Sequence, residues 1–465
     1  LSVMLVEKDD LASHTSSASS KLVHGGLRYL EQYDFKLVRE SLAEREILLR
    51  AAPHIVEPLQ FVMPLGEGSR PAWMLRAGLF LYGHLGGRSR LPGSRAVRLD
   101  RDPFGEALSP GVRHGYTYWD CRVQDSRLVV LNALDAAERG ATVLTHTELV
   151  EAHREDGAWT AQLRGPAGGQ SVRARVLVNA AGAWAAKLFD RLASAKRRRS
   201  IRLLKGSHIV IPRLYAGDHA FILQNPDGRV VFAIPFEEKF TFVGTTEVPC
   251  NGPLDHPRIS DEEFDYLCDT VGRNFRRTIS RDDVIWSYSG LRALVDDGSS
   301  NPSRVTRDYV VELDANGAPL LSVFGGKLTT YRRLAERAVD RIGEFLPTTS
   351  GAWTGRAFLP GGVITDGDLQ RYSRRLFEEY EALPPELLSR LVRTYGTRTE
   401  RLLESVRTVA DLGEPFGAGL YAREVDYLVA NEWARTAEDI LFRRTKLCLH
   451  LDREAAERLA AYLAR

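Results

Sequence analysis

Hydroxyl groups, glycines and cations are concentrated near the start of the chain, in residues 15–30. Hydroxyls and backbone N–H groups at the start of a helix suit a pyrophosphate or a ribityl chain. Adjacent glycines let a ligand approach the backbone closely. An ordinary serine-rich loop that caps a helix accounts for the same residue types. The candidate contacts to a cofactor in this span are Thr15, Ser16, Ser17, Ser19, Lys21, His24, Gly25 and Gly26.

A second candidate anion site lies where an apolar, strand-like run at 319–324 meets the glycine turn GGK at 325–327. A helix with one apolar face is predicted to follow, over residues 328–346. The N-terminus of a helix carries partial positive charge, so this turn can stabilise an anion. A helix start without a ligand would show the same pattern.

The first seven residues, LSVMLVE, predict a buried parallel strand that ends in the acid Glu7. In a dinucleotide-binding fold, the acid that binds the ribose follows a glycine loop by about 20 residues. The spacing therefore places that loop before Leu1, and we expect the chain to be truncated at its N-terminus.

The span from Glu7 to Leu30, with HGGLRYL at 24–30, resembles the aerobic, FAD-dependent glycerol-3-phosphate dehydrogenases. Near the C-terminus, EWA at 432–434 and DILFRRT at 439–445 resemble the helical cap of that family, so the resemblance covers nearly all of the chain. The chain departs from the family pattern in lacking the first strand and glycine loop, and in having Glu247 where the family has Asp. Further motifs follow in the family's order: YWDC at 118–121, KGSHIV at 205–210, GTT at 244–246, YSGLR at 288–292, TRDY at 306–309 and GGKLTTYR at 325–332.

The resemblance implies an enzyme that oxidises sn-glycerol 3-phosphate to dihydroxyacetone phosphate by hydride transfer to N5 of FAD. Its electrons are expected to pass to membrane quinone. An oxidase that uses O₂ is an alternative, and a catalytically silent, truncated chain that does not hold FAD is another. Besides the span at 15–26, the cofactor contacts expected from the resemblance are Glu7, Ala181, Gly182, Trp184, Gly325, Gly326, Lys327, Leu328 and Thr329.

The implied substrate carries a phosphate dianion, and the planar fork of arginine matches phosphate oxygens in a bidentate manner. Any single arginine is more often part of a surface ion pair. The resemblance selects Arg28, Tyr29, Arg292, Arg307 and Lys327 as substrate contacts.

Oxidation of an alcohol requires a base that accepts the hydroxyl proton. His208 is the candidate, because imidazole titrates near neutral pH. A structural histidine in an apolar strand is the alternative interpretation. Arg292 is a second candidate catalytic group, which would stabilise the developing alkoxide.

We expect an α/β (α+β) fold to position these side chains, with a Rossmann-like FAD domain, a mixed-sheet substrate domain and a helical C-terminal cap. We assign residues 1–65, 140–200 and 305–350 to the FAD domain, 66–139 and 201–304 to the substrate domain, and 351–465 to the cap. A core helix is expected over 35–52, with Phe35, Val38, Leu42 and Leu49 on its buried face. Helices of the cap are expected at 369–382, 386–395, 400–405, 424–448 and 453–465.

Lys plus Arg number 63 and Asp plus Glu 61, a balance that argues against a dedicated nucleic-acid binder. The four cysteines show no CxxC spacing, which argues against a metal site and indicates a cytoplasmic location. No run of about 20 apolar residues is present to span a bilayer. Aromatic and basic residues near 73–90 suit peripheral attachment to the inner face of the cell membrane, although a buried helix explains the aromatics as well. A homodimer is possible.

Overall fold

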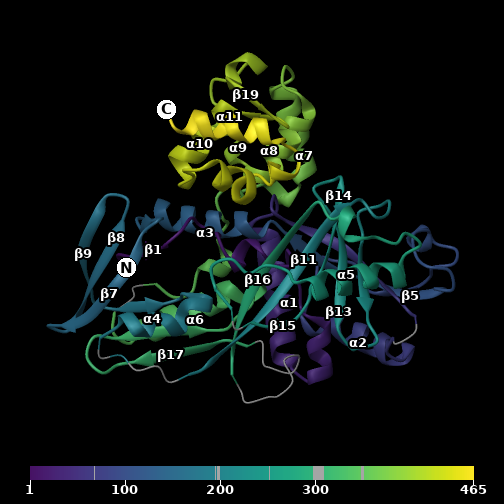
Figure 1. The fold of residues 1–465 in the computed structure, drawn as a ribbon, viewed down its shortest axis with the longest axis horizontal. Coiled ribbons are helices and arrows are strands. Elements are labelled where there is room, and N and C mark those ends of the chain that lie inside the picture. The colour runs from purple at the N-terminus through teal and green to yellow at the C-terminus, as the bar shows by residue number, and fades with distance from the viewer. Residues whose placement is uncertain (67–68, 194, 196–198, 251, 297–307, 347–349) are drawn as a thin grey trace.

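The computed structural model describes residues 1–66, 69–193, 195, 199–250, 252–296, 308–346 and 350–465. Figure 1 shows a broad lower body that contains the large sheets and a separate helical lobe above it, formed by the C-terminal residues. The mixed α/β fold with a helical C-terminal domain confirms the predicted fold class.

The largest sheet has ten strands and supplies most of the candidate catalytic residues. Its pairings are antiparallel except for β12 with β3, so the predicted mixed sheet is confirmed. The sheet takes β2 and β3 from before residue 66, and the predicted domain boundaries remain a prediction. Its order is β15 (Val248–Pro249), β11 (Ile201–Pro212), β14 (Phe240–Gly244), β13 (Val230–Phe236), β12 (Ala220–Gln224), β3 (Val56–Pro64), β5 (His114–Val123) and β2 (Leu22–Val23), with β16 (Trp286–Val295) beside β11 and β4 (Arg95–Arg98) beside β5.

Smaller sheets complete the body. β1 (Met4–Val6) pairs in parallel with β6 (Thr142–Leu144), and β10 (Leu177–Asn179) pairs in parallel with β18 (Leu320–Phe324). The parallel strand expected at 1–7 is confirmed, but its predicted burial is wrong. Met4 is 43% exposed and Leu5 is 42% exposed, because β1 has β6 as its single strand neighbour in the described part of the chain. The remaining strands are β17 (Val310–Asp314), paired with β18, and the antiparallel set β7 (Glu148–Glu155), β8 (Ala158–Gly165) and β9 (Gly168–Ala174).

The predicted core helix is α1 (Phe35–Ala51), which Asp34 caps by accepting a hydrogen bond from the Leu37 backbone N–H at 3.1 Å. Val38 and Leu42 are buried as expected, whereas Phe35 is 40% exposed. Phe35 occupies the first turn, where its ring meets the exposed ring of Tyr33 instead of the core. The other helices of the body are α2 (Ala72–Leu85), α3 (Asp125–Glu138), α4 (Ala185–Leu188), α5 (Asp261–Asn274) and α6 (Tyr331–Gly343).

The C-terminal lobe has its own apolar core, centred on residues such as Tyr395, Phe416 and Leu428. The continuous helix expected over 424–448 is wrong. The helix ends at Glu432, because Trp433 adopts a left-handed backbone conformation (φ 56°), and a π-helical turn follows at Asp439–Arg444. The lobe contains α7 (Leu369–Glu379), α8 (Pro385–Tyr395), α9 (Arg398–Leu402), α10 (Ala422–Glu432), α11 (Arg453–Leu463) and the hairpin β19 (Pro415–Gly417) with β20 (Leu420–Tyr421).

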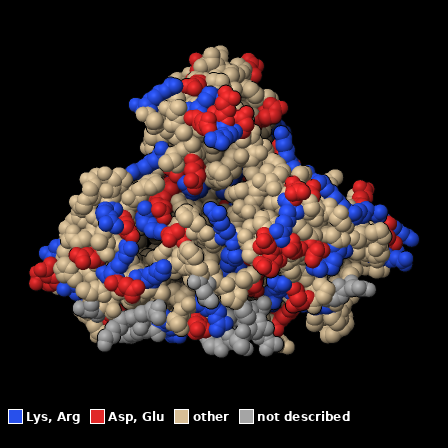
Figure 2. Space-filling view, viewed as in Figure 1, with Lys and Arg blue, Asp and Glu red and all other residues tan. Residues whose placement is uncertain are grey.

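Acidic and basic side chains are interspersed over the face seen in Figure 2, in agreement with the balanced composition. Among the described helices, none combines the length and the apolar content that crossing a membrane would need.

Candidate active site

His208 and Arg292 lie on the neighbouring strands β11 and β16. His208 faces Tyr288 in the register of these strands, and their rings stack with centroids 4.7 Å apart. Tyr288 and Arg292 are four residues apart on β16, so their side chains leave the same face of the sheet. The structure therefore brings the two predicted catalytic residues to one face.

Gly206 explains how the Arg292 side chain reaches across this face. Gly206 lies two residues before His208 on β11, and a Cβ atom there would stand 2.7 Å from Arg292 Nη2 and 2.6 Å from Thr245 Oγ1. Arg292 Nη2 donates a hydrogen bond to Thr245 Oγ1 at 3.0 Å. The guanidinium thus lies over the bare backbone of Gly206, on the side of His208.

The imidazole of His208 is buried and neutral. Burial lowers its pKa well below the ordinary value, and the nearby charges of Arg292 and Lys21 lower the pKa further. Its Nε2 lies 2.9 Å from Ser20 Oγ, and its Nδ1 has no hydrogen-bond partner among the described residues. A neutral imidazole is the form that accepts a proton.

A second group of candidates surrounds Lys327. Its ammonium donates a hydrogen bond to Ser41 Oγ at 2.8 Å and lies 4.4 Å from the centre of the Tyr29 ring. Burial lowers the pKa of Lys327 to about 7. Thr329 Oγ1 donates to the His24 carbonyl at 3.3 Å, so this group brings together Tyr29, His24, Lys327 and Thr329.

His24, like His208, has a lowered pKa. Burial, and then the charges of Lys327 and Arg45, lower the pKa of His24 to about 3. Its ring lies 6.5 Å from that of Phe232, which pairs with Gly244, and Gly244 pairs in turn with His208. His24 was predicted as a cofactor contact, and its burial makes it a second candidate base. No pattern in the sequence predicts this low pKa of His24.

Some of the expected cofactor residues lie near β1 and β16, namely Glu7, Thr15 and the turn at Gly182–Trp184. Glu7 follows β1 and accepts a hydrogen bond from the Asp9 N–H at 3.0 Å, and burial raises its pKa. Thr15 begins a short 3-10 turn (Thr15–Ser17) and bonds the backbone of Leu291 in both directions, at 2.9 and 3.1 Å. The turn at Gly182–Trp184 also contacts β16, and Trp184 packs on His14 at 4.5 Å.

The turn before α6 fits a group that carries negative charge. Gly325 and Gly326 have φ values of 76° and 112°, which favour glycine, and among the described residues the cap positions Lys327 and Thr330 make no side-chain capping hydrogen bond. Thr330 Oγ1 is buried without a partner in the part of the chain that the structure describes. Free N–H groups at a helix start stabilise an anion, so these residues fit the isoalloxazine side of FAD.

Other predicted cofactor contacts bind or pack against side chains of the protein itself. Asp125 binds Ser19 Oγ at 2.8 Å and Lys21 Nζ at 2.9 Å, a buried partner that the sequence did not reveal. A Cβ atom on Gly25 would meet Leu42 and Tyr82, and one on Gly26 would meet Tyr29, so these glycines permit close packing of the protein itself. The cofactor roles of these residues remain predictions. Ser16 is exposed, Arg28 is half-buried at Leu27–Gln32, Ala181 precedes the turn at Gly182–Trp184, and Arg307 lies outside the described residues.

Two family models match the chain. Residues 1–332 match the model described as FAD dependent oxidoreductase, and residues 352–465 match the C-terminal domain of alpha-glycerophosphate oxidase. The first match covers more than half of the chain and the second covers the helical lobe.

Relatives of similar length support the same grouping. The chain is 52% identical over its full length to a glycerol-3-phosphate dehydrogenase of Pseudomonas aeruginosa, of which it covers 90%. It is 47% identical over its full length to the aerobic glycerol-3-phosphate dehydrogenase of Escherichia coli, of which it covers 92%. It is also 49% identical, over 99% of its length, to a D-erythritol 1-phosphate dehydrogenase of Brucella abortus, of which it covers 92%.

The fold agrees with a solved structure that contains FAD. The glycerol-3-phosphate dehydrogenase from Bacillus halodurans, complexed with FAD, superposes with a TM-score of 0.77 at 25% identity, over the whole of this chain and 86% of the other. With these matches over both domains, the chain belongs to the FAD-dependent oxidoreductase family and, within it, to the aerobic glycerol-3-phosphate dehydrogenases, with FAD as its cofactor.

Proposed function

We propose that this chain oxidises sn-glycerol 3-phosphate to dihydroxyacetone phosphate and that the electrons pass to membrane quinone. One observation carries the proposal: the Arg292 guanidinium extends over Gly206 on the side of the buried, neutral His208. A fixed cation and a proton acceptor are thereby held together on one sheet face. A phosphorylated secondary alcohol requires both groups.

Each side chain has a defined task in this reaction. Bound FAD supplies the acceptor for the hydride that leaves the alcohol carbon. His208 Nδ1, which has no partner among the described residues, accepts the hydroxyl proton. Arg292 binds the phosphate or the developing alkoxide, and Lys327 adds a second cation beside Tyr29. Arg28 and Arg307 complete the proposed set of substrate contacts.

A panel of polyol phosphates tests the substrate assignment. The purified holoenzyme is assayed with sn-glycerol 3-phosphate, sn-glycerol 1-phosphate, D-erythritol 1-phosphate and glycerol, using a soluble quinone as acceptor. We expect the highest kcat/KM with sn-glycerol 3-phosphate and no turnover of glycerol. A higher kcat/KM with D-erythritol 1-phosphate would assign the second candidate function, which the relative of that name favours.

The acceptor is tested with the same enzyme. Peroxide formation in air, measured without quinone, distinguishes the oxidase alternative. We expect turnover to depend on quinone and to produce little peroxide. Peroxide in equal amount to dihydroxyacetone phosphate would establish an oxidase instead.

Helix α2 supports the proposed attachment to the inner face of the cell membrane. Leu75, Leu79 and Tyr82 face the core, whereas Trp73 is 74% exposed and Phe80 is 65% exposed. Arg76, Arg88 and Arg90 are exposed nearby. Aromatic residues beside cations are typical of a helix that lies in the membrane interface.

Flotation with vesicles tests this attachment. We expect the wild type to float with vesicles that contain anionic lipid and the variant with Trp73→Ser and Phe80→Ser to stay in the unbound fraction. Equal flotation of the two proteins would contradict the role of α2. The oligomeric state in detergent, measured by sedimentation, tests the proposed homodimer.

A further inference from the structure

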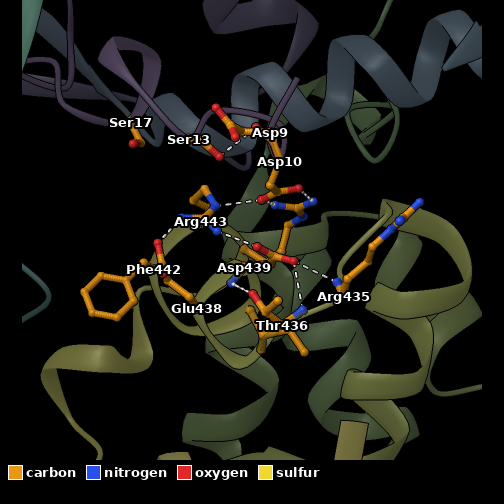
Figure 3. A network of polar contacts seen from close by, with 12 residues as sticks. Asp9, Asp10, Ser13, Ser17, Arg435, Thr436, Glu438, Asp439, Phe442 and Arg443 are labelled. Carbon is orange, nitrogen blue, oxygen red and sulfur yellow. Dashed lines mark hydrogen bonds and ion pairs between the residues drawn. The ribbon is translucent and has the colours of Figure 1, made fainter. Parts of the chain in front are cut away.

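Asp10, a residue of the predicted FAD domain, is buried against the C-terminal lobe. It lies three residues after Glu7 and is 1% exposed. One of its oxygens accepts hydrogen bonds from Arg443 Nε at 2.6 Å and Arg444 Nη1 at 2.7 Å, and the other accepts from Arg444 Nη2 at 2.7 Å. Figure 3 shows Arg443 reaching from the π-helical turn of the lobe toward Asp10.

The two arginines are themselves held in place by the lobe. Asp439 binds Arg443, and its carboxylate also accepts hydrogen bonds from the Arg435 and Thr436 N–H groups at 2.8 and 2.9 Å. Arg444 donates through Nη2 to the carbonyl of Glu432 at 2.6 Å. The guanidinium groups therefore form a rigid receptor for one carboxylate.

Charge balance makes Asp10 necessary to this receptor. The Glu432 carboxylate lies 4.0 Å from Arg444 Nε and also binds Arg127, which extends from α3 of the body. The buried carboxylates of Asp10, Glu432 and Asp439 lie among the guanidinium groups of Arg127, Arg443 and Arg444, and the exposed Glu438 also pairs with Arg443 Nη1 at 2.8 Å. Removal of the Asp10 charge takes its bidentate partner from the buried Arg444 and leaves it Glu432 at 4.0 Å, which is costly.

Asp10 lies in the segment that carries many of the expected FAD contacts. Ser13 bonds the Asp10 carbonyl through its N–H at 3.2 Å and its Oγ at 2.8 Å, so the chain turns toward Thr15 directly after Asp10. Asp125 holds the far end of the segment through Ser19 and Lys21. Residues 11–18 thus lie between a carboxylate bound by the lobe and a carboxylate of the body, and Thr15 within this span also bonds Leu291 of β16.

We propose that Asp10, bound by Arg443 and Arg444, is a positioning residue for the FAD-facing segment at 7–21, and that the C-terminal lobe thereby contributes to cofactor retention. Docking of the lobe holds Asp10 between Glu7 and the turn at Thr15–Ser17. Without that contact the segment keeps the backbone bonds of Glu7 to Leu144 and Thr147, and it keeps its Asp125 end, but it loses the anchor at Asp10. The lobe acts on FAD through Asp10 and need not touch the cofactor.

Asp10→Asn tests this proposal, with Glu424→Gln as the matched control. Glu424 is a buried carboxylate that binds one arginine, Arg390, through both oxygens at 2.8 and 2.6 Å, but it lies wholly within the lobe. Three quantities are measured on each holoenzyme: the rate of FAD release from flavin fluorescence, the thermal midpoint, and hydrogen exchange of residues 7–21.

We expect Asp10→Asn to release FAD about tenfold faster or more, as loss of one charged hydrogen bond predicts, and to lose exchange protection at 7–21. Asp10→Glu, which keeps the charge, should recover part of the retention. Glu424→Gln should lower the thermal midpoint and leave FAD release within about twofold of wild type. Equal FAD release by the Asn variant and the control, at a similar loss of thermal midpoint, would overturn the proposal.

Arg443→Gln covers the case in which Asp10→Asn does not fold, because this variant keeps the bidentate pair of Arg444 with Asp10. The expected effect is about threefold faster FAD release, and an unchanged rate overturns the proposal. No readout involves a substrate, so failure here leaves the proposed reaction intact, and failure of the substrate panel leaves this inference intact.

Discussion

Replacement of Arg292 is the most direct test of the proposed reaction. The Arg292 side chain is 28% exposed, and its guanidinium bonds Thr245, lies over the bare backbone of Gly206 and is 3.9 Å from Glu247. Each hydrogen bond from a charged donor contributes about 1.5–3 kcal/mol, and truncation of a charged group at an interface typically costs about 2–5 kcal/mol. Arg292→Ala should therefore lower kcat/KM by about 30- to 5,000-fold. Arg292→Lys keeps the charge but loses the planar fork, so we expect a loss of about 10- to 100-fold.

The assay measures kcat and KM for sn-glycerol 3-phosphate with a soluble quinone, together with the ratio of FAD to protein from flavin absorbance. Arg281→Ala is the matched control, because that guanidinium lies at the surface, where it binds Asp261 and Asp265 at 2.8 Å. The control should have wild-type kinetics, and all three variants should retain FAD. Whether the loss appears in KM or in kcat distinguishes the two roles of Arg292. Loss of a phosphate contact raises KM, whereas loss of alkoxide stabilisation lowers kcat.

The reasoning is refuted if Arg292→Ala keeps kcat/KM within about threefold of wild type while its FAD content is normal, since no charged contact to the substrate is that weak. A loss of kcat/KM that merely follows a loss of FAD would also contradict the assignment, because it would make Arg292 a cofactor residue.

Three further outcomes follow from the same structure. Gly206→Ala places a Cβ atom 2.7 Å from Arg292 Nη2, so steady-state kinetics should show kcat/KM reduced by at least about tenfold with FAD retained. Unchanged kinetics would show that Arg292 does not need the open space over Gly206. The pKa of Lys327 is about 7 and the second pKa of a phosphate ester is about 6. Because Lys327 loses its charge as the pH rises through 7, a pH profile of kcat/KM should peak between about 6 and 7 and fall above that range. Lys327→Arg should remove the fall on the alkaline side. Arg127→Met leaves the buried Glu432 without this partner and should destabilise the protein by about 3 kcal/mol, seen as a lower thermal midpoint that the double variant Arg127→Met with Glu432→Leu partly restores.

The types of residue in the site could be predicted from the sequence, but their contacts could not. KGSH and YSGLR identified His208 and Arg292, yet nothing in either motif shows that β11 pairs with β16 in a register that leaves Gly206 open for Arg292. Strand register depends on the buried faces of two distant segments, which a single sequence does not specify. The partner of Lys21, Asp125, was missed for the same reason, since a buried ion pair joins residues that are far apart in the chain.

Secondary structure in the lobe shows a similar limit. Helical periodicity correctly predicted α7, α8 and α11, because each has one clear apolar face. It failed at Trp433, whose left-handed conformation is rare for a large side chain and is not signalled by a glycine or proline. The break at Trp433 is followed by the π-helical turn that carries the arginines bound to Asp10. The least predictable turn of the lobe is therefore one that contacts the body, through Asp10.

The charges around the two histidines link binding of the substrate phosphate to the pKa of the base. Burial lowers the pKa of His208 and of His24, and in the protein without substrate the charges of Arg292 and Lys327 lower these pKa values further. A base whose pKa lies far below 7 is uncharged at neutral pH, but it accepts a proton weakly. A bound phosphate dianion carries the opposite charge, so it offsets the cations and raises the pKa of the nearby imidazole at the moment when the hydroxyl proton must be accepted. The phosphate therefore contributes to proton transfer as well as to binding, and its absence from a substrate such as glycerol lowers kcat in addition to raising KM.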